Sequence, residues 1–411
     1  MLGRRSFISS ALAAVAASRF VRAQGCRASE SDDIVQPTTV QIENIVRNNL
    51  PTTSQYIGAA VGVASSSFGT HIQCVGSLVG QNGKKMSFTT DTPFEIASIT
   101  KTFTATAYEL LLQSGAVGPY DTLNRFFGGD LPAGFLAVPL FDLADFTSGF
   151  PTDNGSVDNG GVPVPNANGT LPPSLSGSYS QAEMLKFLSS SPFPLNAPGT
   201  TYSYSNLGFA LLAIALQSAA KSDSFGDLIN DEVLAPLGMV KTQAYDTAIS
   251  ALLPRGFDQT GTQAGPGSGT LPAYDGAGGL VSTPNDMMTW LQFNMGILAI
   301  PTLAGVLTPI QTPNSIPRSS ITPGLGWFVS DLPGSNPKRT IIQKNGDLSG
   351  FCSQTAFLAT EGCSSPSGGA FALVNYHDSG ANAPESPATN IAYDLLLAMI
   401  SPQALVGRPR K

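Results

Sequence analysis

The sequence predicts an α/β (α+β) fold, in which one antiparallel sheet is flanked by helices and joined to a mostly helical lobe. Strand-like segments lie at both ends of the chain and helix-like segments lie between them. Hydrophobic residues make up 42% of the 411 residues, which is enough for a large core. We expect a single domain over residues 24–411, with residues 36–104 and 281–400 in its α/β part and residues 105–280 in its lobe.

The expected elements follow from periodicity and turn residues. Apolar, β-branched runs bounded by turn residues predict strands at residues 58–66, 71–79, 339–343, 353–359 and 370–376. Apolar residues at helical spacing predict helices at residues 102–113, 181–188, 207–220, 284–295 and 386–400. Two early strands and three late ones would complete one sheet from both ends of the chain.

The first 23 residues read as an export signal. Arg4 and Arg5 precede a short apolar stretch that ends at Val21-Arg22-Ala23, a small-residue cleavage pattern. The paired arginines resemble a twin-arginine signal, and an ordinary secretory signal remains the alternative. No later segment reaches the ~18 continuous apolar residues of a membrane helix. We therefore expect an exported protein, periplasmic or secreted, without a stable membrane span.

Composition restricts the partners and cofactors. The formal charge is −7, and removal of the arginine-rich first segment would leave the remainder more acidic. Binding to nucleic-acid phosphates is therefore not expected. Neither a metal-ligand spacing nor a phosphate-binding glycine loop is present in the sequence. We expect no cofactor, no metal and no nucleic-acid partner, and a small molecule or peptide as substrate. The oligomeric state stays open.

Four cysteines, which an exported protein could oxidise, allow three complete pairings: Cys26, Cys74, Cys352 and Cys363. If one extended strand separates Cys352 from Cys363, these two lie too far apart to form a bond. Buried or unpaired thiols are equally compatible with the sequence.

The candidate nucleophile is a serine that lysine, not histidine, would activate. His71 and His377, the two histidines, fall at predicted strand ends, where exposure is the ordinary outcome. A Gly-x-Ser-x-Gly elbow is absent. Ser-x-x-Lys, which puts both side chains on one helix face, occurs at Ser98, Ser218 and Ser335.

Context favours Ser98 among these three serines. Ser335 and its lysine enclose an Asn-Pro loop, and Ser218 ends an apolar helix. Ser98 stands where an extended run meets a helix start, a place suited to stabilising an oxyanion. A simple helix N-cap is the alternative role for Ser98.

The residues around Ser98 resemble the active-site segment of the serine β-lactamase and penicillin-binding-protein superfamily, in its class C-like branch. Further segments similar to that family's motifs follow in its order. After Phe94–Ala105 around Ser98, they are Asp145–Pro151, Tyr204-Ser205-Asn206, Gly278–Met287, Gly324–Trp327 and Lys344-Asn345-Gly346. The resemblance covers about residues 36–400 and implies a β-lactamase/transpeptidase-like fold for the catalytic domain.

The resemblance also implies roles for individual residues. Ser98 would be the acylated nucleophile, Lys101 and Tyr204 would share general-base and general-acid work, and Asn206 would orient Lys101 and the substrate amide. Lys344, Asn345 and Gly346 would line the substrate site, with Lys344 binding a substrate carboxylate. The backbone N–H groups of Ser98 and Asp347 would form the oxyanion hole.

Two departures from the family pattern bear on the substrate. Asn345 replaces the common threonine, and Asp347 puts a carboxylate beside the expected oxyanion hole, which opposes anionic substrates if it faces the cleft. We expect a serine hydrolase that acts on a β-lactam or a D-Ala-D-Ala peptide. A carboxylesterase with the same site, or a penicillin-binding sensor that acylates without turnover, are the alternatives.

Overall fold

The structure, a computed structural model, describes residues 34–152, 179–190, 195–264, 272–314, 316, 321–336, 338–359, 368–378 and 385–400. The predicted signal segment, Cys26 and Cys363 lie outside the described residues, as do the cysteine pairings that involve them. Cys74 and Cys352 are free thiols.

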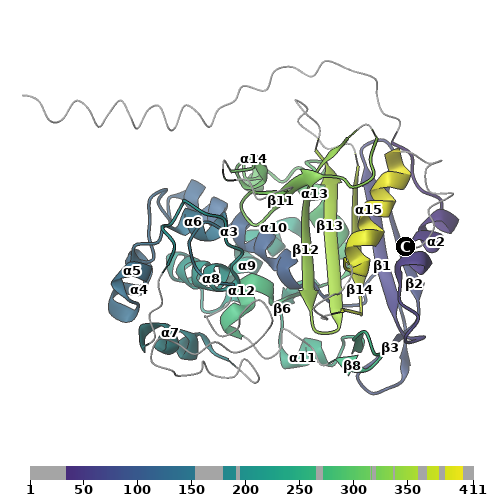
Figure 1. Ribbon diagram of the computed structural model, residues 1–411, viewed down its shortest axis with the longest axis horizontal. Coiled ribbons are helices and arrows are strands. Elements are labelled where there is room, and N and C mark those ends of the chain that lie inside the picture. The colour runs from purple at the N-terminus through teal and green to yellow at the C-terminus, as the bar shows by residue number, and fades with distance from the viewer. Residues whose placement is uncertain are drawn as a thin grey trace, which may run out of the picture.

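A seven-stranded antiparallel sheet forms the right half of the molecule in Figure 1. Its first and last strands in sequence meet inside it, because β1 pairs with β14. In spatial order its strands are β10 (Ile321–Pro323), β11 (Phe328–Asp331), β12 (Thr340–Leu348), β13 (Phe351–Leu358), β14 (Gly369–Val374), β1 (Gly58–Ser65) and β2 (Gly69–Gly76). The predicted sheet, completed from both ends of the chain, is therefore confirmed.

Both faces of the central strands are buried, which explains why they read as continuous apolar runs without alternation. One face packs against α2 (Thr39–Asn49) and α15 (Pro387–Ile400), and α15 lies across the sheet in Figure 1. The other face packs against α13 (Pro284–Asn294) and the central helices. Each fully buried leucine or phenylalanine there contributes about 1.5–3 kcal/mol to the stability of the fold.

Helices make up most of the remainder, to the left of the sheet in Figure 1. Besides α13, the described α-helices between the two halves of the sheet are α3 (Thr100–Ser114), α4 (Asn124–Phe127), α5 (Ala133–Leu136), α6 (Leu140–Ala144), α7 (Gln181–Ser190), α8 (Asn206–Ala220), α9 (Phe225–Ile229), α10 (Ala235–Leu237), α11 (Thr247–Ser250), α12 (Asp275–Gly278) and α14 (Leu307–Gln311). Short strands accompany them: β3 (Leu78–Val79), β4 (Lys85–Met86), β5 (Phe94–Glu95), β6 (Gln243–Ala244), β7 (Gly256–Phe257), β8 (Gln263–Ala264) and β9 (Leu280–Ser282).

Helix α2 was not expected from the sequence, although a signal for it was present. The Thr38 hydroxyl accepts from the Gln41 backbone N–H at 3.2 Å, and the Gln41 side chain accepts from the Thr38 N–H at 2.9 Å. This reciprocal capping box marks the start of a helix. Strands β10 and β11 were also not expected, because runs of three and four residues carry little periodicity.

Candidate active site

Ser98 lies in a single turn of 3₁₀ helix, Ala97–Ile99, directly before α3. Ala97 has φ +48°, a left-handed conformation that costs an alanine about 1–2 kcal/mol. The turn is held from both sides, since the Ile96 N–H donates to the Leu280 carbonyl at 3.1 Å and the Ser353 hydroxyl donates to the Ile96 carbonyl at 2.8 Å. The Ser98 side chain caps neither this turn nor α3. The N-cap alternative for Ser98 therefore does not describe its contacts.

Lys101 follows one turn after Ser98 and is fully buried. Its Nζ donates to the Ser98 Oγ at 3.0 Å, to the Asn206 Oδ1 at 2.7 Å and to the Ala277 carbonyl at 2.6 Å. An ammonium has three donors, and all three are used. The Asn206 side chain thus contacts Lys101 directly.

Tyr204 completes the arrangement from the start of α8. Its hydroxyl donates to the Ser98 Oγ at 2.8 Å. The ring stacks on Phe146 with centroids 5.2 Å apart, while the ammonium groups of Lys101 and Lys344 lie 5.0 and 5.4 Å from its centroid. Both ammonium groups thus lie over the ring of Tyr204. Phe146, which sequence reasoning did not single out, holds this ring in place.

The residues of the two other Ser-x-x-Lys pairs form loop contacts and a helix C-cap. The Ser335 hydroxyl donates to the Leu332 carbonyl at 2.8 Å, and the Lys338 Nζ donates to Asp331 at 2.8 Å. Lys221 is the left-handed C-cap residue of α8, with φ 58°, and its side chain is exposed. Of the three pairs, only that of Ser98 and Lys101 is joined by a hydrogen bond between the two side chains in the described part of the chain.

Lys344 on β12 lies beside the Tyr204 ring and is buried. Its side chain is only 1% exposed, and its Nζ donates to the Asn345 carbonyl at 2.7 Å and to the Asn345 Oδ1 at 3.1 Å. Burial lowers the pKa of the Lys344 ammonium to about 7, against the opposing charge of Asp347. The ammonium faces Tyr204 rather than open space, which disfavours the expected direct contact with a substrate carboxylate.

Gly346 allows β12 to approach the Ala97–Ile99 turn that contains Ser98. A Cβ at this position would lie 2.3 Å from the Ile96 carbonyl oxygen and 3.0 Å from the Ala97 Cβ. The Ser353 hydroxyl lies against both segments, 2.8 Å from the Ile96 carbonyl and 3.3 Å from that of Gly346. Ser353 was missed at the sequence level, because its position depends on the register of β13 against β12.

A cavity of about 460 Å³ lies beside these groups and extends around the edge of β12. Beyond Gln343 that edge has no partner among the described strands, because β11 pairs only with residues 340–343. The cavity is lined by Ser98, Tyr202, Tyr204, Asn206, Ile321, Phe328, Gln343, Asn345, Asp347, Gln354, Glu385, Ser386, Thr389 and Tyr393. Of the predicted site residues, Lys101, Lys344 and Gly346 are not part of this lining.

Asp347 belongs to the lining of the cavity, and it pairs with Cys352, which lies on the α15 side of the sheet. Its Oδ2 accepts from the Asn345 Nδ2 at 2.7 Å, and its Oδ1 lies 3.4 Å from the Nδ1 of His377. The side chain of His377 is 19% exposed. The expectation of a freely exposed strand-end histidine is therefore wrong for His377. His71 lies inside β2 rather than at its start.

Asp145 is a buried carboxyl behind the site, next to Phe146. Burial raises its pKa to about 7, although hydrogen bonds from Thr147 and Asn314 oppose the rise. The negative charge of Asp142 raises it further. A carboxyl whose pKa is raised on folding stabilises the fold below its ordinary pKa of about 4, and this contribution is lost as the pH rises through about 7.

We therefore expect Asp145→Asn to flatten the pH dependence of stability. Between pH ~4 and ~7 the free energy of unfolding of the unmodified protein should fall relative to the variant, by at most about 4 kcal/mol. Urea unfolding of both proteins at several pH values measures the difference. Asp130→Asn, at an exposed position, is the matched control. Parallel curves for the unmodified protein and Asp145→Asn would show that Asp145 keeps an ordinary pKa.

Within the described residues, no group of three or more His, Cys, Asp or Glu side chains is placed to hold a metal ion. None of the helices that the structure describes is long and apolar enough to cross a membrane.

Comparison with known proteins identifies the same family that the motifs indicated. The Beta-lactamase family model matches residues 51–388. The D-alanyl-D-alanine-carboxypeptidase/endopeptidase AmpH of Escherichia coli (strain K12) is 29% identical over 299 residues, which cover 69% of this chain and 71% of AmpH. A beta-lactamase of Pseudomonas fluorescens is 25% identical over 364 residues, covering 78% of this chain and 88% of that protein.

Solved structures share the fold. The D-alanine carboxypeptidase AmpC from Burkholderia cenocepacia superposes with a TM-score of 0.67 at 21% identity, covering 87% of this chain and 99% of that one. The beta-lactamase from Sulfitobacter sp. EE-36 gives a TM-score of 0.68 at 22% identity, covering 90% and 100%. The predicted fold class is thereby confirmed.

Proposed function

Because the chain belongs to the beta-lactamase family of serine hydrolases, we propose that it hydrolyses an amide or ester carbonyl through an acyl-enzyme at Ser98. The observation that carries this proposal is the hydroxyl of Ser98, which lies 3.0 Å from the Lys101 Nζ and 2.8 Å from the Tyr204 Oη. A serine becomes a nucleophile only when a neighbouring group can take its proton.

The contacts favour Tyr204 as the group that takes this proton. The three acceptors around the Lys101 Nζ suit a charged ammonium, which would hold Tyr204 in its phenolate form. The Ser98 Oγ then attacks the carbonyl carbon as its proton passes to the Tyr204 oxygen. The backbone N–H groups of Ser98 and Asp347 would stabilise the oxyanion.

Collapse of the tetrahedral intermediate breaks the C–N or C–O bond, and the proton held by Tyr204 passes to the leaving group. Water then adds to the acyl-enzyme, whose ester bond breaks, releasing the acid and restoring the Ser98 hydroxyl. The same groups serve both halves of the reaction.

The substrates we propose are β-lactams and D-Ala-D-Ala peptides, or esters as the second candidate. The motifs and the relatives support the first. The carboxylate of Asp347 in the cavity and the buried ammonium of Lys344 favour esters, because a substrate carboxylate then meets no cation in the described lining. We further propose that residues 1–23 direct export of a single catalytic domain. N-terminal sequencing of the mature protein would test cleavage after Ala23.

A substrate panel tests the proposed function. We expect the purified protein to hydrolyse at least one of a penicillin, a D-Ala-D-Ala peptide and a p-nitrophenyl ester, with loss of activity in Ser98→Ala. A mass adduct that persists without product would favour a sensor that acylates but does not turn over. If the protein forms neither an adduct nor a product with any of the three, the proposal is wrong.

A further inference from the structure

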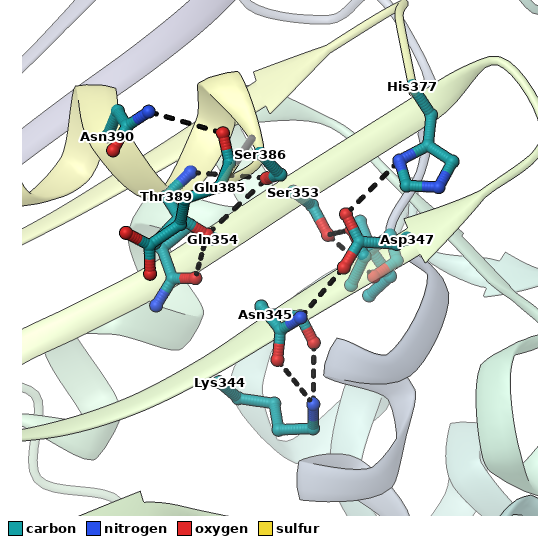
Figure 2. Close-up of polar contacts among 12 residues, drawn as sticks. Lys344, Asn345, Asp347, Ser353, Gln354, His377, Glu385, Ser386, Thr389 and Asn390 are labelled. Atoms are coloured by element: carbon teal, nitrogen blue, oxygen red, sulfur yellow. Dashed lines mark hydrogen bonds and ion pairs between the residues drawn. The ribbon is translucent and has the colours of Figure 1, made fainter. Parts of the chain in front are cut away.

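A chain of four polar side chains starts on β12 and ends at His377 (Figure 2). The Lys344 Nζ donates to the Asn345 Oδ1 at 3.1 Å, and the Asn345 Nδ2 donates to the Asp347 Oδ2 at 2.7 Å. The other oxygen of Asp347 lies 3.4 Å from the His377 Nδ1. The side-chain amide of Asn345 is thus engaged at both ends, its oxygen by the lysine and its nitrogen by the carboxylate.

This arrangement determines which charge a bound substrate meets. Asn345 and Asp347 line the cavity together with Ser98, whereas Lys344 does not. Side chains alternate along a strand, so Asn345 and Asp347 point to the face of the sheet opposite Lys344, and the cavity reaches them around the open edge of β12. A substrate carboxylate on that side of the edge would lie near Asp347, whose Oδ1 is buried, and would compete with its Oδ2 for the N–H groups of Asn345.

The other charged residues of the described lining do not reverse this. The Asp347 side chain is 27% exposed, and Glu385, which is exposed, adds a second carboxylate to the lining. The positive end of α15 reaches the cavity at Ser386, whose hydroxyl already accepts from the Thr389 N–H at 3.4 Å. His377 lies against Asp347, and neither lysine nor arginine belongs to the lining that the structure describes.

We propose that Asp347 makes the active-site cavity select acyl donors that carry an ammonium group, or no charge, near the reacting carbonyl over donors that carry a carboxylate there. This inference rests on the proposed function. Among the proposed substrates, this selection favours esters and peptides with a cationic or uncharged group near the carbonyl over β-lactams and peptides with a free carboxylate there. Asp347 acts through the charge of its side chain, while its backbone N–H serves the oxyanion.

Three p-nitrophenyl esters with acyl chains of similar length test the proposal: the neutral hexanoate, the cationic 6-(trimethylammonio)hexanoate and the anionic hydrogen adipate. The measured quantity is the ratio of kcat/KM for the cationic ester to that for the anionic ester. A ratio cancels any general loss of activity in a variant. We expect a ratio above one in the unmodified protein and a fall of roughly tenfold to a hundredfold in Asp347→Asn, which removes one charge at short range.

Two further variants make the test specific. Asp347→Ala should lower the ratio as Asp347→Asn does, which covers the case in which one of them folds poorly. Glu43→Gln removes the same unit of charge from α2, outside the cavity lining, and should leave the ratio within about twofold of the unmodified value.

A matched peptide pair extends the test to the leaving-group side. A D-Ala-D-Ala peptide with a C-terminal amide should be cleaved faster than the same peptide with a free carboxylate, and Asp347→Asn should narrow that difference. If Ser98 is acylated by these substrates but the ester ratio does not change in the Asp347 variants, the charge selection is wrong and the proposed function stands. If Ser98 is acylated by none of the esters or peptides, the proposed function itself fails.

Discussion

Ser98→Ala is expected to lower kcat/KM by at least about 10³-fold on the best substrate of the panel. The covalent route needs the oxygen that this variant removes, and only transition-state binding in the cavity would remain. Among the described residues, the half-buried Ser98 side chain forms hydrogen bonds with Lys101 and Tyr204. Thermal unfolding of the variant should therefore show a folded protein without activity.

Ser218→Ala and Ser335→Ala are the matched controls, because each removes the serine of a Ser-x-x-Lys pair outside the cavity lining. Both should retain near-normal turnover. If Ser98→Ala keeps its activity, or if Ser335→Ala loses as much as Ser98→Ala does, the nucleophile has been assigned to the wrong serine.

Lys101→Ala and Tyr204→Phe are each expected to slow acylation by roughly 10²-fold or more. The acylation rate of the double variant should fall by much less than the product of the two single losses. The reason is that the Lys101 ammonium acts on Ser98 through the Tyr204 phenol, which takes the Ser98 proton. Pre-steady-state acylation rates for the four proteins measure this coupling. Lys101→Met, which keeps the length of the side chain, controls for the space that alanine would leave.

Strictly multiplicative losses would show that Lys101 and Tyr204 act independently, which would contradict a shared proton path. A normal rate in Tyr204→Phe would leave Lys101 as the base. The Phe146 ring stacked on Tyr204 should hold the phenylalanine of that variant in the same place, so a change in rate reports the hydroxyl.

The sequence predicted the fold class and most of the elements, because long apolar segments carry a clear period. Helix α3 begins two residues before its expected start, and β12 continues five residues beyond its expected end, through Lys344, Asn345 and Gly346. The polar residues at the end of β12 concealed this extension, since their pairing with β13 depends on the sheet rather than on their own propensity.

The order of the motifs along the chain indicated Ser98, Lys101, Tyr204 and Asn206, and the structure brings these four together. The orientation of the β12 side chains could not be predicted in the same way. The side chains of a strand alternate between its two faces, but the face to which Asn345 and Asp347 point depends on where α15 packs. The contact of Asp347 with His377 likewise joins segments that only the sheet brings together.

Irreversible labelling tests the central assignment most directly. A neutral p-nitrophenyl ethyl hexylphosphonate transfers its phosphonyl group to an activated serine, forming a P–O bond as p-nitrophenolate leaves, and the product does not hydrolyse readily. We predict one label for each protein chain by intact mass, located by peptide mapping on Ser98, with complete loss of activity and no labelling of Ser98→Ala. A label on another residue, or turnover that persists in the fully labelled protein, would contradict the assignment of Ser98 as the nucleophile.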